Sequence, residues 1–410
     1  MRILAYPSPG NAREYRLDQV ARQINAQSQS NFYVSNKGMV EQDLRNADVV
    51  VLEQTTSPEK IKLARDITRE TKSLLVAEVD DAFGVNPDSP FKEKHEELEA
   101  TKWLECLCGV SDLVTTTTDY LANMIKSKLR QHGVKKEVAV LPNYLESSLW
   151  EMPIRKNYNG EVRILWAGSC THRADMKYIA PVIHQICQKY PQVKFIHCGD
   201  VELIPLFQDI NSEYVEGVPF RAWPARLHSL RADIGVAPLL DTEFNRCKTN
   251  LKFLEYSIAG IAGVYSDIVY AKTVKDGVTG LIAKNEEEFF EKICLLIENQ
   301  GLREEISAMA YLEAKMKYNI ENHALDWLNA YWYHLSKIRS LKIDVGSGII
   351  PIIGYVHLDA LPQYGEMVAD ILNGIPVANE SVERLHASAI IEHFYLHELK
   401  EKVLPEFYRV

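Results

Sequence analysis

The sequence lacks a long hydrophobic run. No stretch approaches the roughly 18 consecutive apolar residues that a membrane-spanning helix needs. The first residues, 1–7, are too few and too soon interrupted by Pro7 to form the apolar part of a secretory signal peptide. Both absences argue against a helical integral membrane protein, and we expect the chain to lie in the cytoplasm.

The sequence also lacks an excess of positive charge and a disulfide pattern. It has 46 Lys and Arg against 56 Asp and Glu, which gives a net charge of −10. Nucleic-acid binding favours a basic surface, so no nucleic-acid partner is expected, whereas peripheral membrane association stays open. Seven is an odd number of cysteines and their spacing fits no disulfide framework, so we expect reduced thiols.

Apolar segments and helical segments alternate along the chain. A length of 410 residues corresponds to two or three domains of about 150 residues each. Alternation of this kind is typical of a parallel sheet with helices on its faces. In the first 150 residues we expect strands at 2–6, 47–52, 73–79, 113–117 and 138–141, and helices at 12–26, 58–71, 93–108 and 120–132.

The same alternation restarts after an aperiodic linker at 144–160. We expect strands at 162–166, 193–198, 234–237, 262–265 and 280–282, and helices at 174–190, 225–232, 250–259, 286–299, 302–316 and 320–335. The sequence therefore predicts an α/β protein with two Rossmann-like domains, 1–150 and 151–338, and a cleft between their strand ends. Residues 339–410 are too few for a third doubly wound domain, so we expect a partial Rossmann-like α/β segment there.

The most informative stretch lies at 236–266. A polar loop after an expected strand carries Lys248, and Lys252 follows at the start of an expected helix. A helix N-terminus beside two lysines suits a diphosphate, because its free N–H groups and its dipole favour negative charge. Glu255, further along the helix, is positioned to accept hydrogen bonds from ribose hydroxyls. The alternative is an amphipathic helix whose charges are simply solvated.

This stretch resembles the donor-site signature of GT-B glycosyltransferases, especially the retaining glycosyltransferase family 4. Residues 255–266 read EYSIAGIAGVYS, which is similar to the family motif E-x-x-x-x-G-x-P-V-V-x-S. Residues 238–256 are similar to a variant of the motif found in bacterial surface-polysaccharide glycosyltransferases. The resemblance in architecture covers roughly the first 335 residues.

One position departs from the family pattern. The first acid of the family's Glu-x7-Glu pair corresponds to Cys247, and a thiol cannot replace a carboxylate. The resemblance then leaves Phe244, Asn245 and Lys248 to make the sugar and phosphate contacts in this subgroup.

The resemblance implies further donor contacts in the second domain. At Gly168, after the strand at 162–166, the backbone can approach a phosphate, and Arg173 or Lys177 can neutralise it. An ordinary strand-to-helix turn is the alternative. The donor-binding residues implied by the resemblance are Gly168, Ser169, Arg173, Lys177, Val218, Phe244, Asn245, Lys248, Lys252 and Glu255.

The first domain offers candidates for the acceptor side. Asp80 and Asp81 follow an expected strand, and Arg13 follows the loop after the first strand. The two aspartates also resemble the metal site of the single-domain GT-A class. The two-domain layout argues against that class, and no metal is expected.

The resemblance implies a hexosyltransferase-like enzyme that moves a sugar from a nucleoside-diphosphate sugar to a glycan or lipid-linked acceptor. The implied setting is cell-surface polysaccharide biosynthesis, and the implied stereochemistry is retention. Fixed positive charge stabilises the leaving diphosphate in such a reaction. A retaining enzyme needs no conventional general base, so we assign no catalytic residue.

Residues 341–410 resemble the first half of a class I S-adenosylmethionine-dependent methyltransferase. Gly346 and Gly348 occupy the glycine turn after a strand, Asp359 the position that binds the cofactor ribose, and Asp370 the position beside adenine. The later strands of that fold are missing. We therefore expect S-adenosylmethionine to bind only an intact domain and do not expect methyl transfer.

Two alternatives to a glycosyltransferase stay open. One is a fusion centred on an S-adenosylmethionine-dependent methyltransferase that acts on a glycan. The other is a non-catalytic nucleotide-sugar-binding protein, which the thiol at Cys247 suggests.

Overall fold

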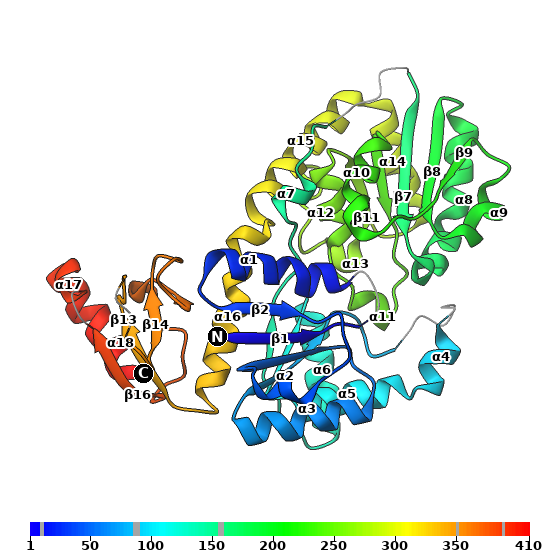
Figure 1. Ribbon diagram of the computed structural model, residues 1–410. Coiled ribbons are helices and arrows are strands. Elements are labelled where there is room, and N and C mark those ends of the chain that lie inside the picture. The colour runs from blue at the N-terminus through cyan, green and yellow to red at the C-terminus, as the bar shows by residue number, and fades with distance from the viewer. Residues whose placement is uncertain (9–11, 85–90, 155–159, 350–351, 388–389) are drawn as a thin grey trace. The chain divides into compact units, whose positions relative to one another are not determined.

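The structure, a computed structural model, describes residues 1–8, 12–84, 91–154, 160–349, 352–387 and 390–410 (Figure 1). It is an α/β structure with two six-stranded sheets and one four-stranded sheet. All strand pairs are parallel, which confirms the expected fold class. Contacts divide the chain into a first unit, Met1–Asp80, Lys102–Leu141 and Ile320–Val410, and a second unit, Asp81–Thr101 and Pro142–Asn319.

The first unit contains a sheet with the order β2-β1-β3-β4-β5-β6. Its strands are β1 (Arg2–Tyr6), β2 (Asn31–Val34), β3 (Val49–Glu53), β4 (Leu74–Val79), β5 (Leu113–Thr116) and β6 (Val138–Val140). The chain leaves β1 toward β2 and then crosses to β3 on the other side, so the topological switch point lies between β1 and β3. Ligands of open α/β sheets commonly bind at such a point, outside the carboxyl ends of the strands.

Helices cover both faces of this sheet, with α1 on one face and α3 and α5 on the other (Figure 1). Every residue of β3 and β4 is buried, as expected for strands packed between two helical layers. The helices and helical turns are the π-helix η1 (Glu14–Asp18), α1 (Gln19–Gln27), α2 (Glu41–Arg45), α3 (Pro58–Thr71), α5 (Ala100–Val110), α6 (Asp119–Gln131), η5 (Ile320–Asn322) and α16 (Ala324–Ser336).

The second unit contains a sheet with the order β12-β11-β10-β7-β8-β9. Its strands are β7 (Val162–Gly168), β8 (Val193–Gly199), β9 (Ser212–Val215), β10 (Ile234–Ala237), β11 (Ala262–Ser266) and β12 (Leu281–Ala283). The switch point of this sheet lies between β7 and β10, because β8 lies on one side of β7 and β10 on the other.

An apolar core in the second unit joins β7, β8, β10 and β11 to α8 and α14. The helices and helical turns of the unit follow in chain order. They are α4 (Lys92–Glu97), α7 (Ser147–Trp150), η2 (Cys170–His172), α8 (Arg173–Lys189), η3 (Val201–Leu203), α9 (Ile204–Phe207), η4 (Phe220–Ala222), α10 (Trp223–Ser229), α11 (Glu243–Arg246), α12 (Leu251–Ile258), α13 (Asp267–Tyr270), α14 (Glu286–Glu298) and α15 (Gln300–Lys317).

The carboxyl-terminal segment belongs to the first unit. Its sheet has the order β15-β14-β13-β16, with β13 (Leu341–Val345), β14 (Val356–Asp359), β15 (Met367–Val368) and β16 (Val382–Ala387). Its short helices are η6 (Ile371–Asn373), η7 (Ile391–His393), α17 (Leu396–Glu398), η8 (Leu399–Val403) and α18 (Leu404–Arg409). Glu366 lies 3.3 Å from the amino terminus at Met1, and Arg339 lies 2.7 Å from Asp48.

Helix α16 contacts α1 and β4, so it packs on the amino-terminal sheet. The sequence places residues 320–335 in the domain that ends at residue 338, whereas the contacts assign them to the first unit. Within the described ranges, no helix is both long and apolar enough to cross a membrane.

A buried ion pair in the first unit connects η1 to β4. Arg16 of η1 and Glu78 of β4 are both fully buried, and their side chains lie 2.8 Å apart. Arg16 also donates to the Leu141 carbonyl at 2.6 Å, while Thr115 of β5 donates to Glu78 at 2.7 Å. The Arg16 guanidinium lies 5.1 Å from the ring of Trp327 on α16, within cation–π range.

We predict that Arg16→Met destabilises the protein by about 3–5 kcal/mol, because it leaves the Glu78 carboxylate buried without its cation. The change is measured by urea unfolding followed by circular dichroism. Arg45→Met is the matched control, because Arg45 pairs with Glu41 and Glu70 at the surface. Equal losses of stability in the two variants would contradict a structural role for the buried pair.

A second buried carboxyl group lies at the end of β3. Glu53 is fully buried, and its Oε2 accepts hydrogen bonds from the Ser8 backbone N–H at 2.8 Å and from the Ser8 hydroxyl at 3.2 Å. Burial, followed by the nearby charge of Asp80, raises the pKa of Glu53 to about 8. The folded protein therefore holds a proton that the unfolded chain releases near the ordinary pKa of 4.5.

We predict that the contribution of Glu53 to the free energy of unfolding falls as pH rises from about 5 to about 8, because this carboxyl group keeps its proton in the folded state in this window. Glu53→Gln removes this contribution, so its stability relative to the wild type should rise by about 1.4 kcal/mol per pH unit. Urea unfolding at several pH values measures the effect. Glu41→Gln, at an exposed site, is the control, and parallel pH profiles for Glu53→Gln and the wild type would refute the prediction.

Candidate functional site

The candidate site of the second unit lies at the switch point of its sheet. The loop after β7 leads through η2 into α8, and the loop after β10 leads through α11 into α12. Two glycines lie at tightly packed strand ends, and Gly199 lets β8 approach β7 closely. A Cβ on Gly168 would lie 2.7 Å from the Trp166 ring, and one on Gly199 would lie 2.3 Å from the Gly168 carbonyl oxygen. The strand ends therefore have no room for larger residues.

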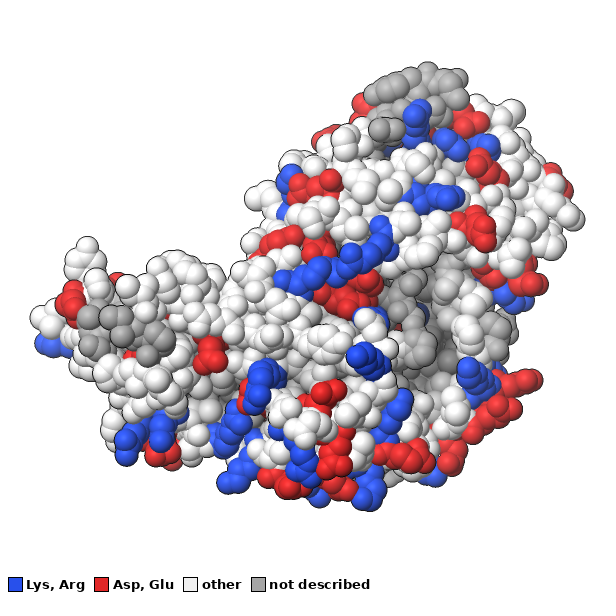
Figure 2. Space-filling model, viewed as in Figure 1, with Lys and Arg blue, Asp and Glu red and all other residues white. Residues whose placement is uncertain are grey.

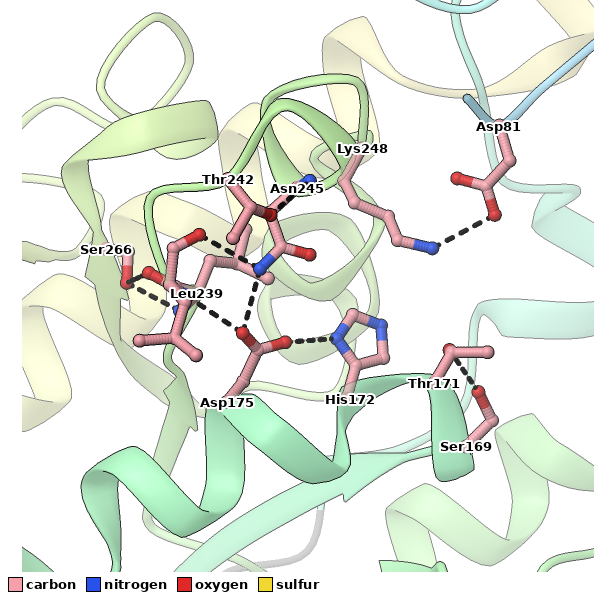
Figure 3. Close-up of polar contacts among 11 residues, drawn as sticks. Asp81, Ser169, Thr171, His172, Asp175, Leu239, Thr242, Asn245, Lys248 and Ser266 are labelled. Carbon is pink, nitrogen blue, oxygen red and sulfur yellow. Dashed lines mark hydrogen bonds and ion pairs between the residues drawn. The ribbon is translucent and has the colours of Figure 1, made fainter. Parts of the chain in front are cut away.

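The buried carboxylate of Asp175 organises this site (Figure 3). Its Oδ1 accepts hydrogen bonds from the Leu240 N–H at 2.9 Å and from the Asn245 amide at 2.8 Å. Its Oδ2 lies 2.9 Å from Nδ1 of His172. Asp175 is fully buried, so these contacts fix the loop after β10 against the start of α8.

The loop after β10 is held at two further points. Thr242 caps α11 by accepting a hydrogen bond from the Asn245 N–H at 3.1 Å. The hydroxyl of Ser266, at the end of β11, accepts from the Leu239 N–H at 2.7 Å. Asn245 itself is buried and donates to both Asp175 and the Leu240 carbonyl. Its amide nitrogen therefore supports the loop.

His172 and Asp175 were not among the residues predicted from the sequence. The sequence feature that could have revealed them is a His-x-x-Asp spacing at the start of a helix, which brings both side chains to one face. Burial lowers the pKa of His172, the hydrogen bond to Asp175 opposes this, and the charge of Lys248 lowers the pKa further. Since the His172 side chain is 20% exposed, it forms part of the surface of the site.

Lys248 lies in the turn between α11 and α12. Its ammonium is 4.4 Å from the centroid of the Phe244 ring and 3.0 Å from Oδ2 of Asp81, a residue that the contacts assign to the second unit (Figure 3). The Lys248 side chain is 15% exposed. This cation is thus largely desolvated and positioned by an aromatic ring and a carboxylate.

Helix α12 carries the two other charged residues predicted from the motif. Lys252 lies 3.1 Å from Oε2 of Glu255, whose side chain is 6% exposed. Asn250, the N-cap residue, makes no side-chain capping bond to the helix and instead donates to Thr273 at 3.3 Å. The first turn of α12 therefore has no capping oxygen from Asn250 competing with a ligand. Cys247 is fully buried, so its thiol faces the interior.

The remaining predicted donor residues lie around the same strand ends. Arg173 donates to both oxygens of Asp200, at 2.8 and 2.9 Å, and this pairing lowers the pKa of Asp200. Lys177 is exposed one turn further along α8, and Val218 is partly buried in the loop after β9. The hydroxyl of Ser169 lies 2.8 Å from that of Thr171. Among the described residues, no contact links Arg173 to Lys248. The Arg173 guanidinium is instead paired with the Asp200 carboxylate.

The acceptor-side candidates of the first unit are also hydrogen-bonded. Arg13 pairs with Asp18 at 2.6 Å, and Asp80 accepts a hydrogen bond from the Gln54 amide. Both residues lie near the carboxyl edge of the first sheet.

The carboxyl-terminal motif residues form a compact turn. Gly346 and Gly348 both have positive φ, as a glycine turn requires. Asp359 accepts from the Gly348 N–H at 3.1 Å and from the Leu361 N–H at 2.9 Å, and Asp370 caps η6 through the Leu372 N–H at 3.0 Å. Both aspartates therefore bind the chain's own backbone, and nothing in the structure adds support for S-adenosylmethionine binding.

Among the residues that the structure describes, no group of three or more His, Cys, Asp or Glu side chains is arranged to hold a metal ion. On the face shown in Figure 2, basic and acidic side chains are intermixed.

Comparison with known proteins rests on solved structures, because no protein-family model and no curated protein sequence matches the chain. Anabaena HepE in complex with UDP-glucose has a TM-score of 0.57 at 13% identity, over 80% of this chain and 99% of that one. Sucrose-phosphate synthase from Thermosynechococcus elongatus has a TM-score of 0.53 at 11% identity, over 80% and 98%. These neighbours are GT-B glycosyltransferases.

The chain has a GT-B fold. TarM has a TM-score of 0.54 at 16% identity, over 69% of this chain and 54% of that one, so the chain matches about half the length of TarM. At these identities the likeness establishes the fold.

We predict that Asp175→Ala destabilises the second unit by about 2–4 kcal/mol, because it leaves the Leu240 N–H and the Asn245 amide buried without their acceptor. Thermal and urea unfolding measure the loss. Asp209→Ala is the control, because the Asp209 side chain is 70% exposed. If both variants unfold alike, Asp175 does not organise the site.

Proposed function

We propose that the protein is a glycosyltransferase that moves a sugar from a nucleoside-diphosphate sugar to a glycan or lipid-linked saccharide acceptor, in the assembly of a cell-surface polysaccharide. The observation that carries the proposal is the position of Lys248 and Lys252 beside the first turn of α12, next to the switch point between β7 and β10.

The diphosphate is the ligand best matched to this geometry. The first turn of α12 presents backbone N–H groups, and the helix dipole adds partial positive charge there. Lys248 and Lys252 supply two cations on the same short segment. Their side chains are only 15% and 23% exposed. A diphosphate binding here displaces Asp81 from Lys248 and Glu255 from Lys252, which frees both ammonium groups for phosphate oxygens.

Glu255 is suited to the ribose. It lies one turn after Lys252 on α12 and is almost fully buried. A carboxylate accepts hydrogen bonds from two adjacent hydroxyls, whereas a diphosphate would repel it. The order along the helix, cations first and carboxylate second, therefore corresponds to the order of diphosphate and ribose in a nucleoside diphosphate.

Departure of the nucleoside diphosphate creates negative charge at the phosphate oxygens while the sugar acquires oxocarbenium character. Fixed cations and N–H dipoles at α12 stabilise that charge without any reorganisation. We propose a retaining transfer that uses this electrostatic stabilisation and no metal ion. His172, oriented by Asp175, lies beside the same cations and is positioned to contact the donor.

The neighbours support a uridine nucleotide as the donor. HepE was solved with UDP-glucose and with UDP and glucose, and a TarM variant was solved with UDP and alpha-GlcNAc-glycerol. We therefore propose a UDP-sugar for this chain as well.

We predict that Lys248→Ala and Glu255→Gln each weaken UDP binding by about tenfold to a hundredfold, because each removes hydrogen bonds to a charged group. Isothermal titration calorimetry measures the affinity, and release of UDP from a UDP-sugar measures turnover. Lys284→Ala, at an exposed lysine after β12, is the matched control and should bind UDP like the wild type.

Undiminished UDP affinity in both Lys248→Ala and Glu255→Gln would overturn the donor site. Tight UDP binding without any sugar transfer to saccharide acceptors would favour a non-catalytic nucleotide-sugar-binding protein.

A further inference from the structure

The first unit contains a pocket of about 300 Å³ at the switch point of its own sheet. Its walls come from the residues that follow three neighbouring strands: Ser8 after β1, Ser35 and Lys37 after β2, and Thr55 after β3. Lys60, in the first turn of α3, completes one side. The pocket therefore lies where ligands of open α/β sheets bind.

The charge of the pocket is opposite to that of the chain. Among the described residues that line it, three are cations and none is Asp or Glu, although the chain has ten more acidic than basic residues. Arg13 is compensated by Asp18 at 2.6 Å. Within the described ranges, neither Lys37 nor Lys60 has a carboxylate within ion-pair distance.

The nearest buried carboxyl group does not cancel this charge. Glu53 lies behind Ser8 and holds it through two hydrogen bonds. Because burial raises the pKa of Glu53 to about 8, the group is mainly protonated and neutral at pH 7. The pocket thus keeps the net positive charge of its lysines.

The hydrogen-bonding groups favour a phosphoryl group over a carboxylate. Proteins recognise carboxylates best with the two-pronged guanidinium of arginine, and the guanidinium here is already bound to Asp18 through two nitrogens. Lysines act as point charges that suit the three oxygens of a phosphate. The hydroxyls of Ser8, Ser35 and Thr55 line the pocket but already donate to the Glu53 carboxyl group, the Lys37 carbonyl and the Glu53 carbonyl, so the two lysines are the groups that select the ligand.

We propose that this pocket binds a phosphoryl group carried by the acceptor saccharide, so that the acceptor is a phosphorylated glycan. The inference rests on the proposed function and names the chemical class of its acceptor. The pocket volume is at the small end of ligand sites, so it accommodates one phosphoryl group with the sugar that bears it.

The test uses the full chain and three probes: glucose 6-phosphate, glucuronic acid and glucose. Ligand-observed NMR titration should show binding of glucose 6-phosphate, weaker binding of glucuronic acid and none of glucose. The double variant Lys37→Ala/Lys60→Ala should lose at least about tenfold in affinity for glucose 6-phosphate. Lys62→Ala is the matched control, because Lys62 lies on the same helix, is exposed and pairs with Asp66.

Several outcomes would overturn the proposal. Unchanged glucose 6-phosphate affinity in the double variant would show that the pocket is not the site, and preference for glucuronic acid would show that the class is wrong. Inorganic phosphate bound as tightly as glucose 6-phosphate would indicate a site for free phosphate instead of an acceptor. Thermal unfolding of each variant verifies that it is folded.

UDP affinity, measured on the same variants, separates this inference from the proposed function. The double variant should bind UDP like the wild type. UDP binding without glucose 6-phosphate binding refutes the phosphorylated acceptor and leaves the glycosyltransferase standing. Glucose 6-phosphate binding without any UDP binding refutes the glycosyltransferase, and with it the assignment of the pocket to an acceptor.

Discussion

The ion pair between Arg16 and Glu78 is the contact on which the first unit depends. It joins η1, which follows β1, to the end of β4, and Thr115 extends the same network to β5. Trp327 packs against the Arg16 guanidinium, so α16 is held by the same group. A buried charge of this kind tolerates few alternative arrangements, because any other packing leaves an ion without its partner. The carboxyl-terminal sheet, which follows α16, belongs to the same unit and is also held directly by the Met1–Glu366 and Arg339–Asp48 ion pairs.

The two large sheets have similarly built switch points. Strand ends on either side of that point carry short polar loops, and the loops are fixed by buried carboxyl groups: Asp175 in the second unit and Glu53 in the first. The carboxyl group that fixes the loop is not the group offered to the ligand. We propose that Lys248, Lys252 and the start of α12 bind the ligand in the second unit, and that Lys37 and Lys60 do so in the first. The two proposed ligands both carry phosphate because both switch points present lysines.

Local patterns made much of the fold predictable. Strand β10 and helix α3 lie at the predicted residues, because an apolar run defines the first, while Ser57 and Pro58 mark the start of the second. Strands β2 and β9 were missed, since each has four residues and few buried ones. The packing of α16 on the first sheet brings Trp327 to Arg16, more than 300 residues away, which no local pattern reveals. In the candidate site, the motif singles out Lys248 and Glu255, whose binding roles stay predictions. The pairing of Arg173 with Asp200 and the position of Asp175 against Asn245 depend on contacts between segments that follow separate strands.

In the proposed complex, the start of α12 holds the diphosphate of the donor and Glu255 holds its ribose. A crystal structure of the protein with UDP tests it most directly. We expect phosphate oxygens within hydrogen-bond distance of Lys248 and of the first N–H groups of α12. Both ribose hydroxyls should donate to Glu255, and Asp81 should be displaced from Lys248. UDP bound elsewhere, with the Lys248–Asp81 and Lys252–Glu255 pairs intact, would contradict it.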